Sequence, residues 1–124
     1  MIVGLGVDIE EVERVHRLAD QYRQRFLDRV FTRQEQDYCF GRARPYHHLA
    51  ARFAAKEALS KALGTGWTGR FRWRDAEVMK DDQGKPFFRL HNELLEQVRG
   101  RNVLLSISQA SDHVTATVII ERGD

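Results

Sequence analysis

Cysteine, proline and long apolar runs are all scarce in this sequence. The single cysteine, Cys39, excludes an internal disulfide and any metal site built from several cysteines. No apolar run approaches the roughly 20 residues that a membrane-spanning helix needs. The opening MIVGLGVDIE lacks the basic leader and the long apolar stretch of a signal peptide. We therefore expect a soluble, cytoplasmic protein with no membrane partner.

Repeats, low-complexity tracts and linkers are also missing. The 124 residues are 42% hydrophobic, which suffices for one packed core, so residues 1–124 are predicted to form a single domain. The net charge of only +2 says little about partners. A domain of this size buries only a modest share of its surface when it folds, and many small domains gain further stability by forming oligomers.

The opening segment alternates between two kinds of residue with a period of two, which predicts a strand with one buried face. The odd positions are apolar and the even positions are small or acidic: Val3, Leu5, Val7 and Ile9 against Gly4, Gly6, Asp8 and Glu10. We expect the apolar face to be the buried one.

Other elements are predicted from the spacing of apolar residues and from the glycines, prolines and capping residues that end helices and strands. The expected helices are 11–30, 32–38, 48–63 and 92–98, and the later expected strands are 70–79, 86–90, 103–108 and 114–121. Thr32 with Glu35 resembles a capping box, and Gly64 and Gly66 suit a left-handed helix cap. Pro45 and Pro86 are interpreted as loop markers. Because helices and strands mix without a regular βαβ alternation, an α+β fold is favoured over a doubly wound sheet.

Asp8 is the first candidate for chemistry. It shares its strand face with Gly4 and Gly6, and glycines beside a carboxylate leave space for a ligand to approach the backbone. The alternative is an exposed acid on an ordinary edge strand.

Two polar rows on the helix 48–63 are the second candidate. Arg52, Lys56 and Ser60 are spaced four residues apart, as are Glu57 and Lys61. Such rows usually mark a solvated face with weak ion pairs. Alternatively, the carboxylate binds a divalent cation while the cationic side chains hold phosphate.

An arginine series along the helix 11–30 and just beyond it is the third candidate, and it comprises Arg14, Arg17, Arg23, Arg25, Arg29 and Arg33. A solvated face is the plainest interpretation. Nucleic acid is a second, since clustered arginine suits phosphate. An acidic protein partner is a third, with Leu18, Tyr22 and Phe26 as apolar anchors.

Histidine and cysteine give weaker signals. The five histidines show no zinc-binding spacing, and His47-His48 is interpreted as a surface loop pair. Cys39 has no activating neighbour in the sequence and is expected to be a buried small residue.

Five segments resemble the small holo-[acyl-carrier-protein] synthases of the 4′-phosphopantetheinyl transferase superfamily. In the family's order they are GVDIEEVER (6–14), FTRQEQDYC (31–39), RFAAKEALSKALGTG (52–66), GKPFF (84–88) and TATVIIE (115–121). The resemblance implies an α+β fold with a mixed sheet packed against a long central helix. It also implies transfer of 4′-phosphopantetheine from coenzyme A to a serine of an apo acyl carrier protein.

By that resemblance, Asp8 and Glu57 are Mg²⁺ ligands, and Lys61 contacts coenzyme A and stabilises or protonates the leaving phosphate. Arg52, Gly64 and Pro86 are expected to line the coenzyme A cleft. The serine proton passes to Glu57 or to a metal-bound water.

The resemblance also gives the arginine series a partner. The helix is expected to dock an acidic helix of the carrier protein, whether from fatty acid synthesis or from a secondary pathway, and not nucleic acid. The expected contacts are Arg14, Leu18, Arg25, Phe26 and Arg29. Members of this family form trimers with the coenzyme cleft between neighbouring subunits, so a homotrimer is implied.

Two positions depart from the family's pattern. Gln109 stands where many members have histidine in a SISH-like sequence, although His113 is near in sequence. Glu10 is an acid where the small synthases often lack one, and it shares a strand face with Asp8. Glu10 is therefore interpreted as either a third metal ligand or a solvated side chain.

Overall fold

The structure is a computed structural model that describes residues 1–64 and 72–123. In chain order its elements are β1 (Ile2–Glu11), α1 (Val12–Val30), α2 (Arg33–Phe40), α3 (Pro45–Leu63), the 3₁₀ helix η1 (Trp73–Asp75), β2 (Ala76–Lys80), β3 (Pro86–Leu90), α4 (Asn92–Gln97), β4 (Arg101–Gln109) and β5 (His113–Arg122). This order of helices and strands confirms the predicted α+β class.

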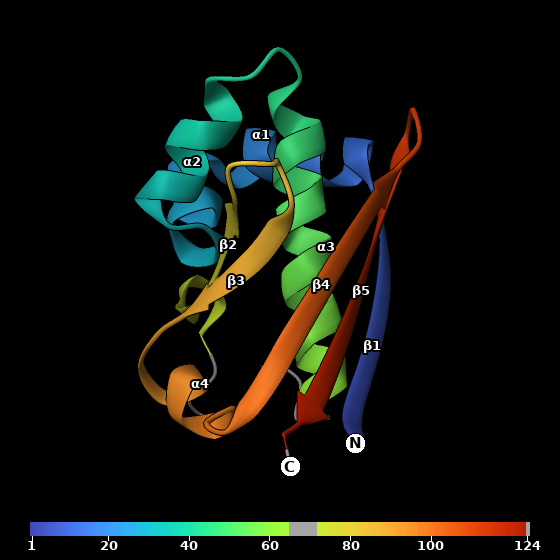
Figure 1. Cartoon of the computed structure of the whole chain (residues 1–124). Helices are drawn as coiled ribbons and strands as arrows, with labels where there is room; N and C mark the ends of the chain where they lie inside the picture. The colour runs from blue at the N-terminus through green and yellow to red at the C-terminus, as the bar shows by residue number, and fades with distance from the viewer. Residues whose placement is uncertain (65–71, 124) are drawn as a thin grey trace.

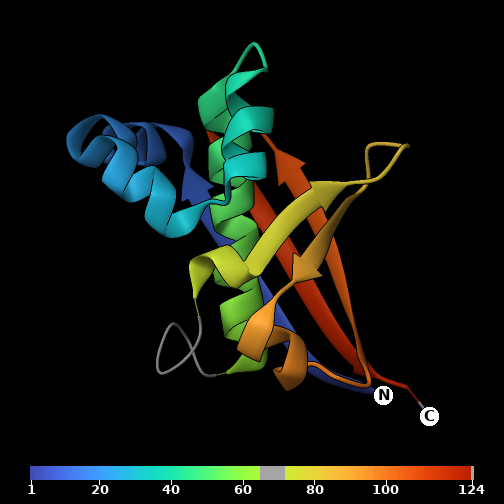
Figure 2. The same ribbon diagram turned by 90° about the vertical axis from the view of Figure 1, so that its left-hand side faces the viewer.

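The long helix α3 lies along one face of a three-stranded sheet of order β1-β5-β4 (Figure 1). Strands β2 and β3 form a separate hairpin, and α1 and α2 pack against α3, with α2 also in contact with β2 (Figure 2). The described strand pairs are all antiparallel, so the expectation of a mixed sheet was wrong in that detail.

The apolar face of β1 is the exposed one, which corrects the prediction. Gly6, Asp8 and Glu10 face α3 and are buried, whereas Leu5 and Ile9 are each 62% exposed. Period-two alternation identifies two faces but does not say which one a helix covers. Here α3 packs on the side with the smaller residues.

Several predicted boundaries also shift. Helix α3 begins at Pro45, which occupies the first turn, where its missing N–H costs nothing, so His47 and His48 are helical rather than in a loop. Pro86 opens β3 instead of marking a loop. Strand β2 starts only at Ala76, after η1. The predicted strand start at 70–71 and Gly66 lie outside the described residues.

The capping predictions are confirmed where the structure describes them. Thr32 accepts from the backbone N–H of Glu35 (3.2 Å), and the Glu35 side chain accepts from that of Thr32 (2.9 Å). Gly64 closes α3 with φ 77°, a left-handed conformation that glycine adopts without a steric penalty. Inside α1, Arg23 has φ 53° and ψ −134°, and this kink divides the helix into two segments.

A buried ion pair lies among the helices. Lys56 is fully buried, and its ammonium donates to Glu35 (2.8 Å), to the Val30 carbonyl (2.8 Å) and to the Trp73 carbonyl (3.0 Å). All three of its N–H donors therefore have partners. The second Glu35 oxygen accepts from the Val78 N–H (3.0 Å), so this one pair joins α1, α2, α3, η1 and β2.

Candidate active site

Close contact between β1 and α3 creates the candidate site. A side-chain carbon at Gly6 would overlap the carbonyl oxygen of Ala58, and one at Gly4 would overlap that of Ala62. The helix backbone thus occupies the space beside these glycines. The expectation that these glycines leave room for a ligand was wrong, because the backbone of α3 packs against them. This contact carries Asp8, the next residue on the same face of β1, up to α3.

Asp8 meets Lys61 across this contact. Lys61 Nζ donates to Asp8 Oδ1 and to the Val7 carbonyl, each at 3.0 Å. Asp8 is only 8% exposed, which excludes the interpretation as an ordinary exposed acid, whereas the Lys61 side chain is 53% exposed. Asp8 Oδ2 is buried and accepts no hydrogen bond from an N–H donor among the described residues. The cluster thus combines a carboxylate with an unused buried oxygen and a cation that can reach solvent.

Glu10 joins the cluster from the same strand. It is 7% exposed, so the solvated interpretation is excluded, and its Oε1 accepts from Arg14 at 2.9 Å. Burial, a hydrogen bond with Asp8 and the charge of Asp8 raise the pKa of Glu10 to about 8, and the Glu57 charge adds to this. Two buried carboxyl groups side by side mark a place where a cation would be favourable.

These residues fit a Mg²⁺ ion held in part by a ligand. Within residues 1–64 and 72–123, no three His, Cys, Asp or Glu side chains form a ready metal centre. Mg²⁺ usually takes one or two carboxylates and completes its shell with substrate phosphate and water. The buried Asp8 Oδ2, together with Glu10 and the Glu57 charge that acts on Glu10, is a donor set of that kind.

The expected coenzyme-binding residues lie in two separate places. Arg52 and Pro86 line a cavity of about 130 Å³, together with Gln109. Arg52 is 2% exposed, its guanidinium stacks on the Tyr38 ring at 4.4 Å, and its Nε has no hydrogen-bond partner among the described residues. Gly64 is twelve residues further along α3, about 18 Å away at the helical rise. One chain therefore does not bring all of them together.

Of the two rows on α3, the one formed by Arg52, Lys56 and Ser60 is not a solvated face. Lys56 and Ser60 are buried with Arg52, so the i, i+4 spacing correctly grouped them but wrongly suggested exposure. Lys56 points into the core and is not available for phosphate. Tyr38, which supports Arg52, was missed because no sequence signal links α2 to α3 at that point.

The expected docking residues occupy both segments of α1. Arg14 and Leu18 precede the kink at Arg23, and Arg25, Phe26 and Arg29 follow it. Arg25 and Arg29 are exposed, whereas Arg14 is already paired with Glu10. Phe26 is half-buried, and its ring packs edge-on against Phe31 with centroids 6.0 Å apart.

Cys39 behaves as predicted. It is fully buried, and burial raises the pKa of its thiol to about 11, so the reactive thiolate is not formed at neutral pH. No helix among the described residues has the length and apolarity to cross a membrane.

Residues 4–118 match the 4′-phosphopantetheinyl transferase superfamily, and the chain belongs to that superfamily. It is similar to the holo-[acyl-carrier-protein] synthase of Protochlamydia amoebophila, with 44% identity over 119 residues that cover 96% of this chain and 98% of that protein. The corresponding synthase of Geobacter sulfurreducens is 39% identical over 125 residues, covering 98% and 99%.

Solved structures agree with this assignment. The holo-[acyl-carrier-protein] synthase of Neisseria meningitidis superposes with a TM-score of 0.90 at 38% identity, covering 98% of this chain and all of that one. The synthase of Bacillus anthracis in complex with CoA (3′,5′-ADP) gives a TM-score of 0.84 at 37% identity, covering 99% of both chains.

Proposed function

We propose that this chain transfers the 4′-phosphopantetheine group of coenzyme A to a serine of an apo acyl carrier protein, leaving 3′,5′-ADP. The observation that carries the proposal is the buried Asp8 carboxylate, paired at 3.0 Å with Lys61 beside Glu10, on which the Glu57 charge acts, in a chain of this superfamily.

The reaction exchanges one P–O bond for another. The serine oxygen attacks the phosphorus that carries pantetheine, the bond from that phosphorus to 3′,5′-ADP breaks, and the serine proton must leave. Charge on the phosphoryl oxygens is what such a site has to stabilise, because little other covalent chemistry is needed.

Asp8 and Glu57 would hold Mg²⁺, which supplies charge neutralisation on the pyrophosphate when it is bound. Lys61 is half-exposed and one helical turn from Glu57, so its ammonium can move from Asp8 to the leaving phosphate and stabilise or protonate it. Glu57 or a bound water would accept the serine proton as the new bond forms. The buried Glu10 would serve as a further ligand or would orient Asp8.

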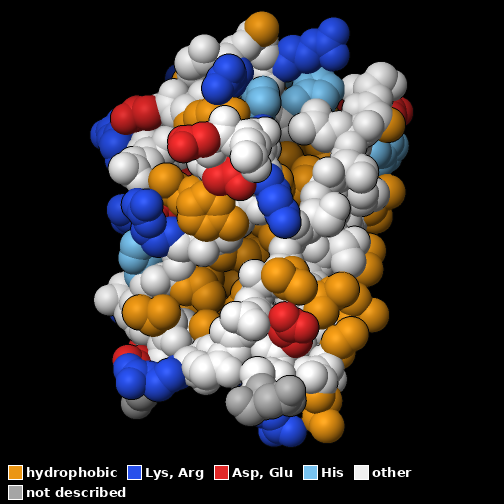
Figure 3. All heavy atoms as spheres, in the orientation of Figure 1, with side chains coloured by type: hydrophobic (Ala, Val, Ile, Leu, Met, Phe, Trp, Pro, Cys, Tyr) orange, Lys and Arg blue, Asp and Glu red, His pale blue; other side chains and the backbone are white. Residues whose placement is uncertain are grey.

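A homotrimer would bring the two sets of coenzyme-binding residues together. Arg52 lies near the middle of α3 and shares a cavity with Pro86, whereas Lys61 and Gly64 lie at the C-terminal end of the helix, so the cleft between neighbouring copies can combine them. Figure 3 shows hydrophobic side chains along the right-hand edge, where β1 lies. Exposed apolar strips of this kind mark contacts with a partner, and the large side chains exposed here are Ile2, Val3, Leu5, Val7 and Ile9.

The carrier protein would dock on α1. Arg25 and Arg29 are exposed cations there, and Leu18 adds apolar surface. Long-range attraction between exposed arginines and an acidic helix would raise the association rate and make it sensitive to salt.

The direct test is to incubate the chain with apo carrier protein, coenzyme A and Mg²⁺, and to follow the carrier by intact mass spectrometry. The expected result is a gain equal to one phosphopantetheine group, and none with a carrier whose acceptor serine is replaced by alanine. No gain with any of several carrier proteins would overturn the proposal.

A further inference from the structure

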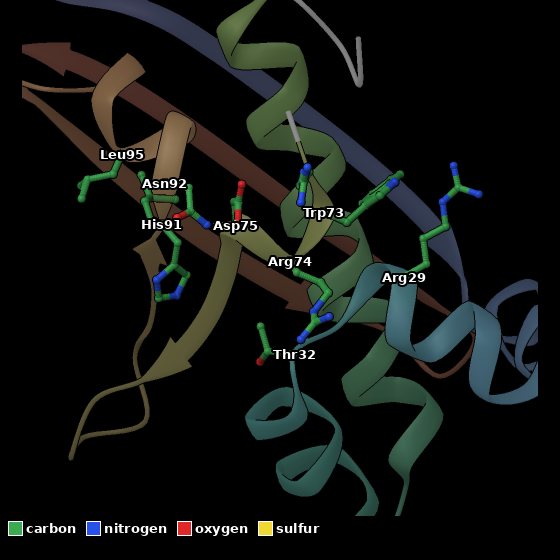
Figure 4. A pocket seen from close by; sticks show the side chains of 10 residues that line it. Arg29, Thr32, Trp73, Arg74, Asp75, His91, Asn92 and Leu95 are labelled. Carbon is green, nitrogen blue, oxygen red and sulfur yellow. Dashed lines mark hydrogen bonds between the residues drawn. The ribbon is translucent and has the colours of Figure 1, made fainter. Parts of the chain in front are cut away.

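A second and larger hollow lies away from the Asp8–Lys61 cluster. It has a volume of about 740 Å³ and is bounded by the end of α1, by η1 and by the segment from the end of β3 into α4 (Figure 4). Neither Asp8, Glu57, Lys61 nor Arg52 lines it. The family-based expectations assign nothing to this hollow except Arg29, which also lies on the docking helix.

Three cationic side chains line this hollow. Arg29 comes from α1, and Arg72 and Arg74 come from η1 and its approach. Among the described residues, none of these three guanidiniums makes a hydrogen bond or an ion pair, whereas Arg14 and Arg99 elsewhere are paired with carboxylates. Three like charges around one hollow repel each other, and an anion would relieve that repulsion.

The two acids in the wall of the hollow do not pair with these arginines, although the charge of Arg74 acts on the exposed Asp28 and helps to lower its pKa. Asp75 is 6% exposed, and its Oδ1 accepts from the Asn92 amide at 2.9 Å. Glu77 lies buried behind the wall, where it accepts from Thr32 Oγ1 at 2.6 Å and is bonded to His91 Nε2 at 3.0 Å. The hydrogen bonds of both carboxylates thus go to Asn92, Thr32 and His91 in the wall, and not to the arginines.

The wall is also well supported. Thr32 links Glu77 to Glu35, because its hydroxyl accepts from the Glu35 N–H at 3.2 Å, and Glu35 is fixed by the buried Lys56. Asn92 has φ 54°, an unusual conformation for a residue other than glycine, and from there its amide reaches Asp75. Fixed polar groups of this kind suit a preformed binding site.

We propose that this hollow is a second anion-binding site, which takes a small phosphorylated molecule through Arg29, Arg72 and Arg74. Guanidinium groups match phosphate oxygens in geometry as well as charge, and three of them suit a ligand with at least two negative charges. The volume lies within the range of small-molecule pockets. Leu90 and Leu95 in its wall would contact an apolar part of that molecule.

The test is a calorimetric titration of the full chain with sodium pyrophosphate, at low salt and with EDTA present. Arg72→Gln/Arg74→Gln should weaken binding by at least about tenfold, because two charge-assisted hydrogen bonds are lost. Arg33→Gln/Arg89→Gln removes the same charge from exposed positions outside both sites and should bind like the unaltered chain. Lys61→Gln should also bind normally, and Arg29→Gln, on a separate element, should bind more weakly.

Three results would overturn the proposal. Equal losses in the two double variants would assign the binding to overall charge, and a loss confined to Lys61→Gln would place it at the first site. Failure of the unaltered chain to bind pyrophosphate would also overturn the proposal, above all if Arg72→Gln/Arg74→Gln instead raised the KM for the carrier protein. That last pattern would make the hollow part of a protein-docking surface.

Discussion

Asp8 and Glu10 stand two residues apart on the buried face of β1, and each is tested by removing its charge. Asp8→Asn should lower phosphopantetheine transfer by about 10²–10³, the usual effect of losing one charge-stabilising group. Glu10→Gln should be milder and should mainly raise the Mg²⁺ requirement, because it removes a carboxylate that would help to hold the ion beside Asp8. Rates from intact mass spectrometry across a Mg²⁺ titration measure both effects.

The exposed neighbour Glu11 provides the matched control for these variants. Glu11→Gln should leave both the rate and the Mg²⁺ titration unchanged. Full activity of Asp8→Asn at saturating Mg²⁺ would remove Asp8 from the set of essential ligands. An unchanged titration for Glu10→Gln would leave Glu10 with a structural role only.

Lys56 offers a test of stability rather than catalysis. Lys56→Met leaves the Glu35 carboxylate buried without its cation, and loss of one partner of a buried pair costs about 3–5 kcal/mol. Lys56→Met/Glu35→Gln should recover part of that loss, because no unpaired charge remains. Urea denaturation at one fixed protein concentration measures the free energy of unfolding. The exposed Lys85→Met is the control, and a similar loss there would refute the importance of the pair.

At the scale of elements, the contact between β1 and α3 holds the site together. Gly6→Ala would press a methyl group on the backbone of Ala58, which cannot rotate away. We expect a loss of about 1–3 kcal/mol from overpacking, together with lower activity as Asp8 moves from Lys61. Gly123→Ala is the control, because that site is open and has an ordinary φ. Wild-type stability and activity of Gly6→Ala, measured by denaturation and transfer assay, would contradict this account.

Local signals predicted the elements whose ends are set by nearby residues. The capping box of α2 and the glycine cap of α3 involve contacts within four residues, so the sequence contains them in full. The kink at Arg23 had no such signal, because a non-glycine residue in that conformation depends on the surrounding packing.

The residues that the sequence misplaced depend on distant elements. Lys56 resembled a solvated cation because its partner, Glu35, lies 21 residues away on another helix. The exposed side of β1 was mistaken for the buried one because the choice rests on the glycines that α3 contacts. Asp8 and Glu57 were associated only through the family resemblance, since their spacing does not show that they lie close.

For the whole molecule, the proposed shared cleft predicts complementation between two inactive variants. Asp8→Asn and Arg52→Ala should each be inactive alone. If each cleft takes Asp8 from one subunit and Arg52 from its neighbour, mixed trimers contain intact clefts. Random mixing of equal amounts in a cyclic trimer would restore about a quarter of the wild-type activity. The measurement is transfer rate after the two variants are mixed, dissociated and reassembled.

Sedimentation of the separate and mixed variants provides the control, since all three samples should be trimeric. Trimers that regain no activity on mixing would place Asp8 and Arg52 in the same subunit's site. A fully active monomer would rule out the shared cleft altogether.

Helix α3 sets the angular position of every group that it carries. Each residue in a helix turns the chain by about 100°, so one residue inserted between Arg52 and Glu57 would rotate Glu57 and Lys61 away from β1. Small adjustments of the helix backbone cannot compensate for a rotation of this size. During evolution, insertions and deletions in relatives of this chain should therefore be excluded from 52–63 and should accumulate in loops such as 81–84. An aligned set of such relatives would show constant length across this helix.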